Sequence, residues 1–340
     1  MKNIFPQPKY LGAKFKLLDW IGNCIPSNIN VVFDAFSGSQ SVAYYLKQRG
    51  FKTYTNDFLN FNNQIGLALI ENNNVILTDD DINNIIQPIE NDHFIEKMYC
   101  NLFFEKDDCV FLDNCRANIE KMSIYKKALA FSIINRAMTR KITMGHFAHT
   151  KAIEYMHNDE RIKRNKSLVI PLKEIFLELL PSYNDAVFDN GKENKSFCDD
   201  ALNILPHLKD IDLIYIDPPY CTSHADYQNF YHLLETYVNK WTDKTYINSI
   251  KRYEPRIYSG FDKKCDVIHS FEKLFELSKD IPHWLISYNN RSYPNIDIFK
   301  NMIDKYKDVE IKENTYTNSN GGKGSVKESK ELLFVCSPKK

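Results

Sequence analysis

Short apolar runs alternate with amphipathic segments along this chain, which is the pattern of a mixed α/β fold. Val31 to Phe33 and Leu213 to Ile216 are uninterrupted apolar runs, rich in residues that favour strands. Such runs are typical of strands that are buried on both faces of a parallel sheet. Lys52 to Thr55 and Trp284 to Asn289 are expected to add two more strands.

Helices are predicted where apolar residues recur three or four positions apart. Ser41 to Gln48 forms one such segment, and a second lies between Leu17 and Ile21. The longest candidate runs from Ile119 to Met144, with Gly145 as its expected end. The segment from His146 to Lys166 is basic and less regular, so we expect a loop or an arm there.

The apolar run from Leu213 to Ile216 leads directly into Asp217, Pro218, Pro219 and Tyr220. In open α/β sheets, ligands bind at the edge where the parallel strands end. The two prolines stiffen this loop, because each ring fixes φ and removes an N–H donor. Asp217 and the Pro218 carbonyl can accept hydrogen bonds from an amino group, while the Tyr220 ring offers a stacking face. This combination fits methylation of an exocyclic amine on a nucleobase; the simpler alternative is a proline turn whose aspartate only caps a helix.

Residues near the N-terminus have the pattern of a nucleotide-binding βα unit. Val31 to Phe33 is followed by a turn of small residues from Asp34 to Gln40, in which Gly38 allows close approach of a ligand to the backbone. Asp57 lies about twenty residues beyond the glycine turn, where an acid binds ribose hydroxyls in such folds. A dinucleotide site would more typically have three glycines, and Gln40 stands where another is expected.

Two further segments have both a structural and a functional interpretation. Pro8 to Lys14 is either a basic arm that leads into a helix or part of a binding site. Asp199 and Asp200 precede Leu202 and further apolar residues, so either acid could cap the N-terminus of a helix.

Together these motifs resemble those of the adenine-specific DNA methyltransferases, which include the Dam enzymes and many restriction-modification methylases. That family binds its cofactor with a Tyr-x-Gly-x-Lys segment and a Phe-x-Gly-x-Gly segment. This chain matches the two segments at Tyr10, Gly12, Lys14, Phe36 and Gly38. Gln40 replaces the last glycine, which puts its backbone contact in question. The tetrapeptide from Asp217 to Tyr220 matches the catalytic motif without a change, and the resemblance covers the whole chain.

The resemblance implies a Rossmann-like S-adenosylmethionine-dependent methyltransferase sheet with a mostly helical target-recognition insertion. We expect residues 1–75 and 191–340 to form the catalytic core and residues 76–190 to form the insertion. The cofactor is expected to be S-adenosylmethionine. The residues expected to bind it are Tyr10, Gly12, Lys14, Asp34, Phe36, Gly38, Asp57, Asp199, Asp200 and Asp217.

The implied reaction is a direct transfer of a methyl group to the N6 amine of an adenine that is flipped out of the duplex. Catalysis is assigned to Asp217, Pro218, Pro219 and Tyr220, without a covalent intermediate or a metal. Tyr227 and His232 are further candidates for the base pocket, with packing in the core as the alternative.

The C-terminal stretch resembles the terminal β-hairpin of these methyltransferases. Its two strands are expected at Val309 to Tyr316 and at Lys330 to Cys336, joined by the Gly- and Asn-rich segment from Asn318 to Ser325.

Charged residues are unevenly distributed, although the chain has no net charge. Arg116 to Lys166 contains twelve lysines and arginines against four acids, whereas Asp79 to Asp113 contains ten acids against two lysines. This asymmetry indicates one face that binds a polyanion, the alternative being an ordinary solvated helical surface. The residues expected to contact double-stranded DNA, mostly at phosphates, are Arg136, Arg140, Lys141, Arg161, Lys163 and Arg164.

Eight cysteines are scattered without a Cys-x-x-Cys pair, so neither a zinc site nor a disulfide framework is indicated. The chain has no N-terminal signal pattern and no apolar stretch of the roughly 18 residues that span a membrane. These features predict a cytoplasmic protein with no membrane partner. The family implies a monomer and, for a modification enzyme, a cognate restriction endonuclease.

Three other functions stay open on the sequence alone. The same loop can methylate the N4 amine of cytosine, although serine in place of Asp217 is more typical there. Methylation of adenine in RNA is disfavoured by the size of the insertion, which is that of a DNA-reading module. A DNA-binding protein on an inactive methyltransferase fold is disfavoured by the intact tetrapeptide.

Overall fold

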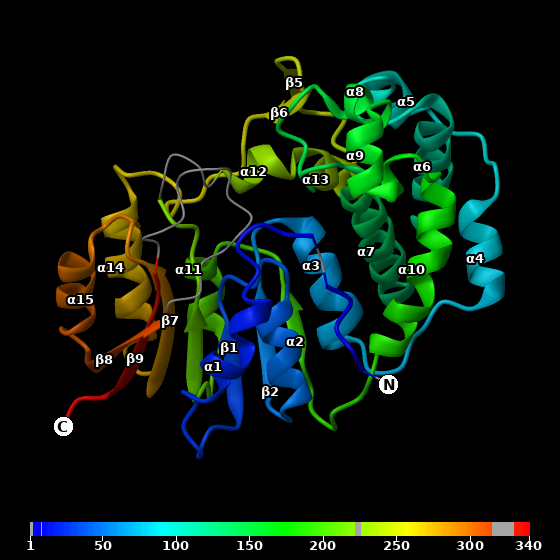
Figure 1. Ribbon diagram of the computed structural model, residues 1–340. Coiled ribbons are helices and arrows are strands. Elements are labelled where there is room, and N and C mark those ends of the chain that lie inside the picture. Colours follow the sequence, from blue (N-terminus) through cyan, green and yellow to red (C-terminus); the bar gives the residue numbers. More distant parts are fainter. Residues whose placement is uncertain (1–2, 8, 222–225, 315–329) are drawn as a thin grey trace. The chain divides into compact units, whose positions relative to one another are not determined.

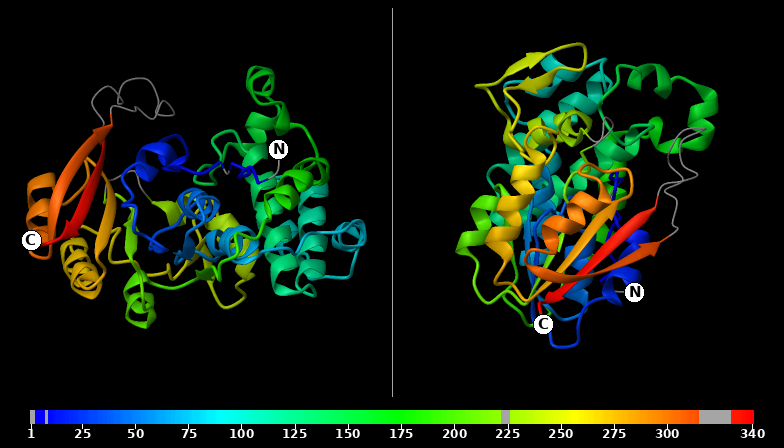
Figure 2. Two further views of the ribbon diagram at one scale, coloured as in Figure 1. Left: turned by 90° about the horizontal axis from the view of Figure 1, so that it is seen from below. Right: turned by 90° about the vertical axis from the view of Figure 1, so that its left-hand side faces the viewer.

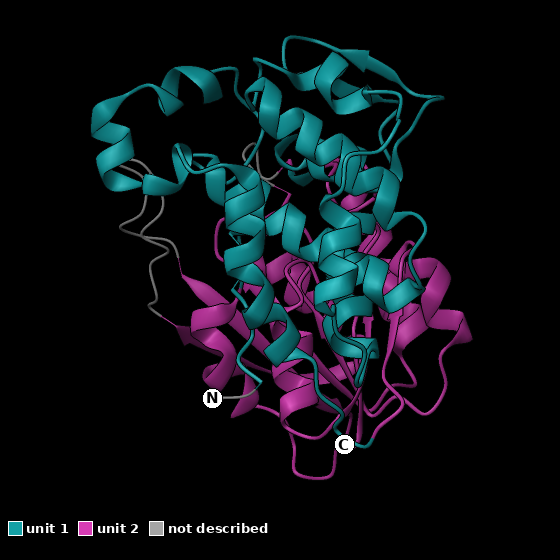
Figure 3. Ribbon diagram, turned by 90° about the vertical axis from the view of Figure 1, so that its right-hand side faces the viewer, with its two compact units in different colours: residues 1–13, 59–191, 227–257 teal, residues 14–58, 192–226, 258–340 magenta. Residues whose placement is uncertain are grey.

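The computed structural model describes residues 3–7, 9–221, 226–314 and 330–340. The chain forms two compact units, each assembled from three separate segments (Figure 3). Unit 1 consists of Met1–Ala13, Leu59–Gly191 and Tyr227–Ile257, and unit 2 consists of Lys14–Phe58, Lys192–Asp226 and Tyr258–Lys340.

Unit 2 is built on a seven-stranded sheet of described residues with the strand order β3-β2-β1-β4-β7-β9-β8 (Figure 1). The strands are β1 (Val31–Asp34), β2 (Lys52–Asn56), β3 (Lys195–Phe197), β4 (Leu213–Ile216), β7 (His283–Asn289), β8 (Lys307–Asn314) and β9 (Glu331–Pro338). The first five strands in this order are parallel. Strand β9 is antiparallel to both β7 and β8. The fold is therefore of the expected α/β class, with a mostly parallel sheet.

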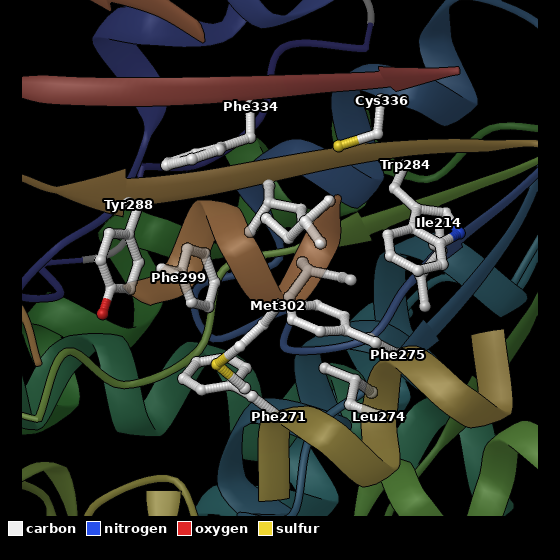
Figure 4. Packing of buried hydrophobic residues seen from close by; sticks show 14 of the residues in the cluster. Ile214, Phe271, Leu274, Phe275, Trp284, Tyr288, Phe299, Met302, Phe334 and Cys336 are labelled. Carbon is white, nitrogen blue, oxygen red and sulfur yellow. The ribbon is translucent and has the colours of Figure 1, made fainter. Parts of the chain in front are cut away.

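Helices pack on both faces of this sheet. They are η1 (Phe15–Leu17), α1 (Leu18–Gly22), α2 (Ser41–Gln48), α11 (Ala201–Ile204), η4 (Leu205–His207), α14 (Val267–Ser278) and α15 (Ile296–Ile303). On one face, Ile214 and Trp284 belong to the core that Phe271 and Phe299 complete from α14 and α15 (Figure 4). On the other face, Tyr215 packs in a core with side chains of α1 and α2. Burial on both faces explains the uninterrupted apolar run of β4.

The predictions for the sheet and for α2 are confirmed. The helix occupies Ser41–Gln48 as expected, and the strands differ from the predicted ranges by one residue at most. The terminal hairpin is confirmed in β8 and β9, which Figure 2 shows in orange and red at one edge of the sheet. Its predicted connection, Asn318 to Ser325, lies outside the described residues.

Unit 1 is mostly helical. Its helices are α3 (Asn60–Gly66), the π-helix η2 (Leu67–Glu71), α4 (Asp79–Ile86), α5 (Phe94–Tyr99), α6 (Lys106–Ile119), α7 (Ile124–Lys141), α8 (Ala152–Met156), α9 (Asp159–Arg164), η3 (Lys166–Leu168), α10 (Leu172–Ala186), α12 (Tyr227–Phe230) and α13 (His232–Asn239). A short hairpin is formed by β5 (Thr245–Ile247) and β6 (Arg252–Glu254).

Two predictions in unit 1, one of a helix and one of a loop or arm, need correction. The segment from Ile119 to Met144 is not one helix, because Ile119 ends α6 and α7 begins only after Ser123, whose backbone is extended. The carbonyl of Ser123 accepts the first hydrogen bond of α7, from the amide of Lys127 at 2.8 Å. The basic segment beyond Gly145 contains α8 and α9, the latter capped by the Asn158 side chain.

The compact unit around residues 76–190 is larger than the expected insertion, because it begins at Leu59 and takes in residues 1–13 and 227–257. One cause is Glu235 of α13, which accepts hydrogen bonds from the amides of Asn60 and Phe61 at 3.0 and 2.9 Å. These bonds satisfy the N-terminus of α3 and link it to a segment far away in sequence.

Candidate active site

Acidic residues lie at the carboxyl ends of three adjacent parallel strands of unit 2. Asp34 ends β1, Asp57 follows β2 and Asp217 follows β4. Strand β1 pairs with β2 on one side and with β4 on the other, so these ends share one sheet edge (Figure 1). Strands β2 and β3 lie on one side of β1 and the later strand β4 on the other, so the strand order reverses at β1. Open α/β sheets bind ligands beside such a reversal.

Lys14 and Tyr220 lie beside the carboxylate of Asp217. The Nζ atom of Lys14, whose side chain is 6% exposed, lies 2.9 Å from Oδ2 of Asp217. The Tyr220 hydroxyl lies 3.3 Å from Oδ1 of the same carboxylate, and its ring centre lies 5.0 Å from the Lys14 ammonium. Pro218, which is buried, and Pro219 connect the acid to the ring. The structure therefore brings together residues from two of the sequence motifs.

Burial and neighbouring charges shift the pKa values of the cluster formed by Asp34, Asp217 and Lys14. Burial raises the pKa of Asp34 well above its usual value, and the Asp217 carboxylate raises it further. Burial also raises the pKa of Asp217, although the ammonium of Lys14 counteracts it. Burial alone would lower the pKa of Lys14, but Asp217, Glu331 and Asp34 outweigh burial and keep that pKa raised.

Glu331 is a residue of this site that the sequence motifs did not reveal. Because β9 is antiparallel to β7, its first residue lies beside Asn289, at the edge where the parallel strands end. The Oε2 atom of Glu331 lies 3.1 Å from the Tyr220 hydroxyl. The predicted terminal hairpin could have indicated Glu331. An acid at the start of the second hairpin strand lies at the edge where the parallel strands end.

The cluster favours a positively charged ligand. The carboxyl groups of Asp34, Asp217 and Glu331 all raise the pKa of one ammonium, that of Lys14. Both carboxylate oxygens of Asp34 are buried, and the nearby backbone amides of Phe36 and Ala43 offset only part of the effect of burial on its pKa. A cation at this edge would therefore stabilise groups that are otherwise poorly compensated.

The glycine turn is supported by Asp57. Gly38 has a φ of +46°, and its amide donates to Oδ2 of Asp57 over 2.8 Å. Phe36 packs edge-on against Phe261, with 4.9 Å between the ring centres. Asp57 thus helps to shape the turn, whether or not it also contacts a ligand.

Gln40 has a left-handed backbone conformation, which glycine adopts more readily than other residues. Its φ of 64° and ψ of 10° are left-handed, and its side chain is fully buried. The Oε1 atom accepts a hydrogen bond from the Thr55 hydroxyl at 2.6 Å. The substitution therefore keeps the turn and adds an anchor on β2.

The two acids after β3 differ in their surroundings. Oδ1 of Asp200 accepts a hydrogen bond from the amide of Leu202 at 2.9 Å, so the predicted helix cap is confirmed for Asp200. Asp199 is exposed, and its Oδ1 accepts a hydrogen bond from the Asn203 side chain at 3.0 Å.

Tyr10 and Gly12 belong to unit 1, whereas Lys14 belongs to unit 2. The Tyr10 ring is nearly parallel to the rings of Tyr231 and Tyr227, with centres 4.8 and 5.7 Å apart. Gly12 has a φ of +80°, and a Cβ there would come within 2.8 Å of the Tyr227 hydroxyl, so a side chain would be strained.

His232 is a core residue of unit 1. It is fully buried among Tyr99, Phe103 and Phe147, and its Nε2 lies 3.1 Å from the Phe147 carbonyl. Burial lowers the pKa of its imidazole to about 4. Of its two interpretations, packing in the core is the one the structure supports.

The predicted DNA-binding residues fall into two groups. Lys141 is buried and paired with Asp108, so its ammonium does not reach the surface and the prediction for it needs correction. Arg136 donates from Nε to the Gln7 carbonyl at 2.9 Å, and Arg140 pairs with Glu178 at 2.9 Å. The second group, on α9, is more accessible. It consists of Arg161, Lys163 and Arg164, of which the last two are exposed.

Among the described residues, no group of three or more His, Cys, Asp and Glu side chains is placed to hold a metal ion. A search of the same residues finds no helix with the length and apolarity needed to cross a membrane.

Residues 10–317 match the sequence model of the D12 class N6 adenine-specific DNA methyltransferases. The chain is 34% identical to the type II methyltransferase M2.HphI of Haemophilus parahaemolyticus, with 97% of each chain covered. It is 23% identical to the type II methyltransferase M.CviAII of Paramecium bursaria Chlorella virus 1, over 89% of each chain. A match to the modification methylase StsI of Streptococcus sanguinis, at 25% identity, covers 97% of this chain and 52% of that protein. The chain belongs to the D12 class of N6 adenine-specific DNA methyltransferases.

Proposed function

We propose that this adenine-N6 DNA methyltransferase uses S-adenosylmethionine, acts within one short site of double-stranded DNA, and serves as the modification enzyme of a restriction system. Relatives that are named type II methyltransferases support the restriction role. A cognate endonuclease would then recognise the same site. We also propose that the enzyme acts as a monomer and is located in the cytoplasm. The proposed location rests on its eight cysteines, which form no disulfide bond and suit a reducing compartment.

The observation that carries the proposal is the fixed carboxylate of Asp217 beside Tyr220. Adenine's amino lone pair is delocalised into the ring, so the nitrogen is a poor nucleophile until its hydrogens are held. Asp217 and the carbonyl of Pro218 would accept these two N–H groups and direct the lone pair away from the ring plane. Lys14 fixes Oδ2 of Asp217 at 2.9 Å, which orients the carboxylate before the substrate arrives. Asp217 would also accept the proton that N6 loses after methylation.

The charge at the sheet edge supports the proposed cofactor. S-adenosylmethionine supplies a methyl group on a positively charged sulfonium. Asp34 and Asp217 would stabilise the positive charges of such a cofactor, and Gly38 lets the backbone approach it closely. Asp57 and Asp199 are our candidates for its ribose and adenine, because Oδ1 of Asp200 already caps α11. We also propose that Tyr10, Gly12 and Phe36 contribute to cofactor binding.

Unit 1 is our candidate for target recognition, with residues 76–190 as its main part. Lys163 and Arg164 of α9 are exposed, as residues that contact phosphates must be. Arg136 and Arg140 would contact phosphates after DNA displaces Gln7 and Glu178, their present partners. Lys141 is not proposed as a DNA contact, because it is buried and paired with Asp108.

The decisive experiment maps methylated bases in DNA from a methylation-free host that expresses the chain. N6-methyladenine confined to one short motif would support the proposal and identify the site. Asp217→Ala, with the carboxylate removed, should abolish the marks while S-adenosylmethionine still binds in calorimetry. Methylated cytosine, or activity on RNA alone, would overturn the proposed substrate. Near-normal methylation by Asp217→Ala would overturn the proposed mechanism.

A further inference from the structure

Tyr220 has one hydroxyl proton, and two carboxylates of the described residues lie within hydrogen-bond distance of its oxygen. Its oxygen lies 3.1 Å from Oε2 of Glu331 and 3.3 Å from Oδ1 of Asp217. A phenol carries a single donor, and the shorter distance favours Glu331 as its acceptor. The hydroxyl of Tyr220 is therefore held from β9 as well as from its own loop.

The sheet fixes the position of Glu331. It is the first residue of β9, and it lies opposite Asn289 of β7 and Asn314 of β8. A strand paired on both sides presents its side chains more rigidly than a loop does. Glu331 also lies beyond residues 10–317, which match the family model.

The two carboxylates have different tasks in the proposed reaction. Asp217 is the acceptor for the N6 amine, and Lys14 already engages its Oδ2. A hydrogen bond from Tyr220 would engage Oδ1 of Asp217, the carboxylate oxygen that Lys14 leaves for the amine. Donation to Glu331 avoids this competition and still fixes the ring, whose edge-to-face partner is Tyr288 at 6.0 Å.

We propose that Glu331 is a positioning residue of the methyl transfer: it accepts the Tyr220 hydroxyl, fixes the ring for stacking on the flipped adenine, and leaves Asp217 to the N6 amine. The inference rests on the proposed function and adds a residue that acts through Tyr220, without contact with the substrate.

The kinetic test compares single-turnover methylation by Glu331→Ala, Glu331→Gln and Tyr220→Phe. Glu331→Ala should be slower by about tenfold, the equivalent of one hydrogen bond. Glu331→Gln keeps an acceptor and should stay within about threefold of the wild type. The matched control is Glu313→Ala, which removes an exposed carboxylate of the same hairpin that pairs with Lys330 at 2.7 Å. This control should have the wild-type rate.

A double variant tests whether the two residues act together. Tyr220→Phe combined with Glu331→Ala should be no slower than the slower single variant, because both changes remove the same hydrogen bond. Losses that multiply would overturn the inference. A wild-type rate for Glu331→Ala, or an equal loss in Glu331→Gln, would also overturn it.

A second readout does not depend on activity. With 3-fluorotyrosine at position 220, the fluorine resonance of the free protein should shift in Glu331→Ala and stay close to its original position in Glu331→Gln and Glu313→Ala. No shift in Glu331→Ala would show that Glu331 does not hold the hydroxyl. A wild type that leaves adenine unmethylated would refute the proposed function, whereas this resonance tests the contact separately.

Discussion

The ammonium of Lys14 lies 2.9 Å from the carboxylate of Asp217, although the two residues come from different segments of unit 2 that are far apart in the sequence. In the proposed reaction Asp217 accepts one N–H group of adenine, and the ionised carboxylate is a stronger acceptor than the protonated acid. Burial raises its pKa, and Lys14 is the cation that counteracts this rise. Lys14 therefore keeps Asp217 ionised as well as oriented.

Lys14→Met should move the acid limb of the pH–rate profile to higher pH. As pH falls, Asp217 takes up a proton, becomes a weaker acceptor for the N6 amine and can no longer take the proton that N6 loses. Without the ammonium its pKa is higher still, so this loss begins at a higher pH than in the wild type. At neutral pH we expect a rate lower by about 10²-fold, measured in single turnover. The control is Lys16→Met, two residues away at an exposed position. Superimposable pH profiles of Lys14→Met and the wild type would contradict this role.

Asp34 should release a proton when the cationic cofactor binds. Its pKa is raised well above the usual value by burial, and a nearby positive charge lowers it again. Affinity for S-adenosylmethionine should therefore rise as pH increases through the raised pKa. Calorimetry in two buffers of different ionisation enthalpy measures the protons released, and Asp34→Asn should release fewer. Proton uptake by the wild type would be the opposite result and would rule out this account.

Tyr220→Ala should impair the reaction more than it impairs cofactor binding. Base stacking is worth roughly 1–3 kcal/mol, which corresponds to a loss of about 5- to 150-fold. The measurements are the single-turnover rate and the fluorescence of 2-aminopurine at the target position, which reports a base outside the stack. Tyr220→Phe keeps the ring and should keep most of the fluorescence change. Equal losses in methylation and in cofactor affinity would argue against stacking.

The sequence predicted the local elements of the catalytic unit well, because each depends on a short pattern. The apolar run of β4 and the helix Ser41–Gln48 are examples. The break at Ser123 was missed because apolar residues keep a helical spacing on both sides of it. Glu331 was missed for a different reason, since its place at the site depends on the antiparallel pairing of β9 with β7. Topology, and not local pattern, brings it to Tyr220.

Gln40→Gly should be more stable than Gln40→Ala by about 1–2 kcal/mol, because only alanine keeps a Cβ in the left-handed region. Both variants lose the hydrogen bond between Gln40 and Thr55, so the comparison isolates the backbone term. Urea denaturation of the two variants measures the difference in the free energy of unfolding. Equal stability would mean that the turn relaxes to another conformation when the Thr55 contact is absent.

Lys141 and the α9 cations should respond differently to substitution, although composition alone treats them as one basic group. Lys141 is buried with Asp108, and removal of one partner of a buried ion pair costs about 3–5 kcal/mol. Lys141→Met should therefore lower the free energy of unfolding and leave the salt dependence of DNA binding unchanged.

Lys163→Ala and Arg164→Ala change exposed side chains of α9. Lys163 pairs with Glu160 in a solvent-exposed ion pair, which contributes little, so the free energy of unfolding should hardly change. Each should reduce the slope of log K against log salt concentration by about 0.9 if it removes one phosphate contact. Fluorescence anisotropy over a salt series measures these slopes, and an unchanged slope in both α9 variants would exclude this helix from the DNA interface.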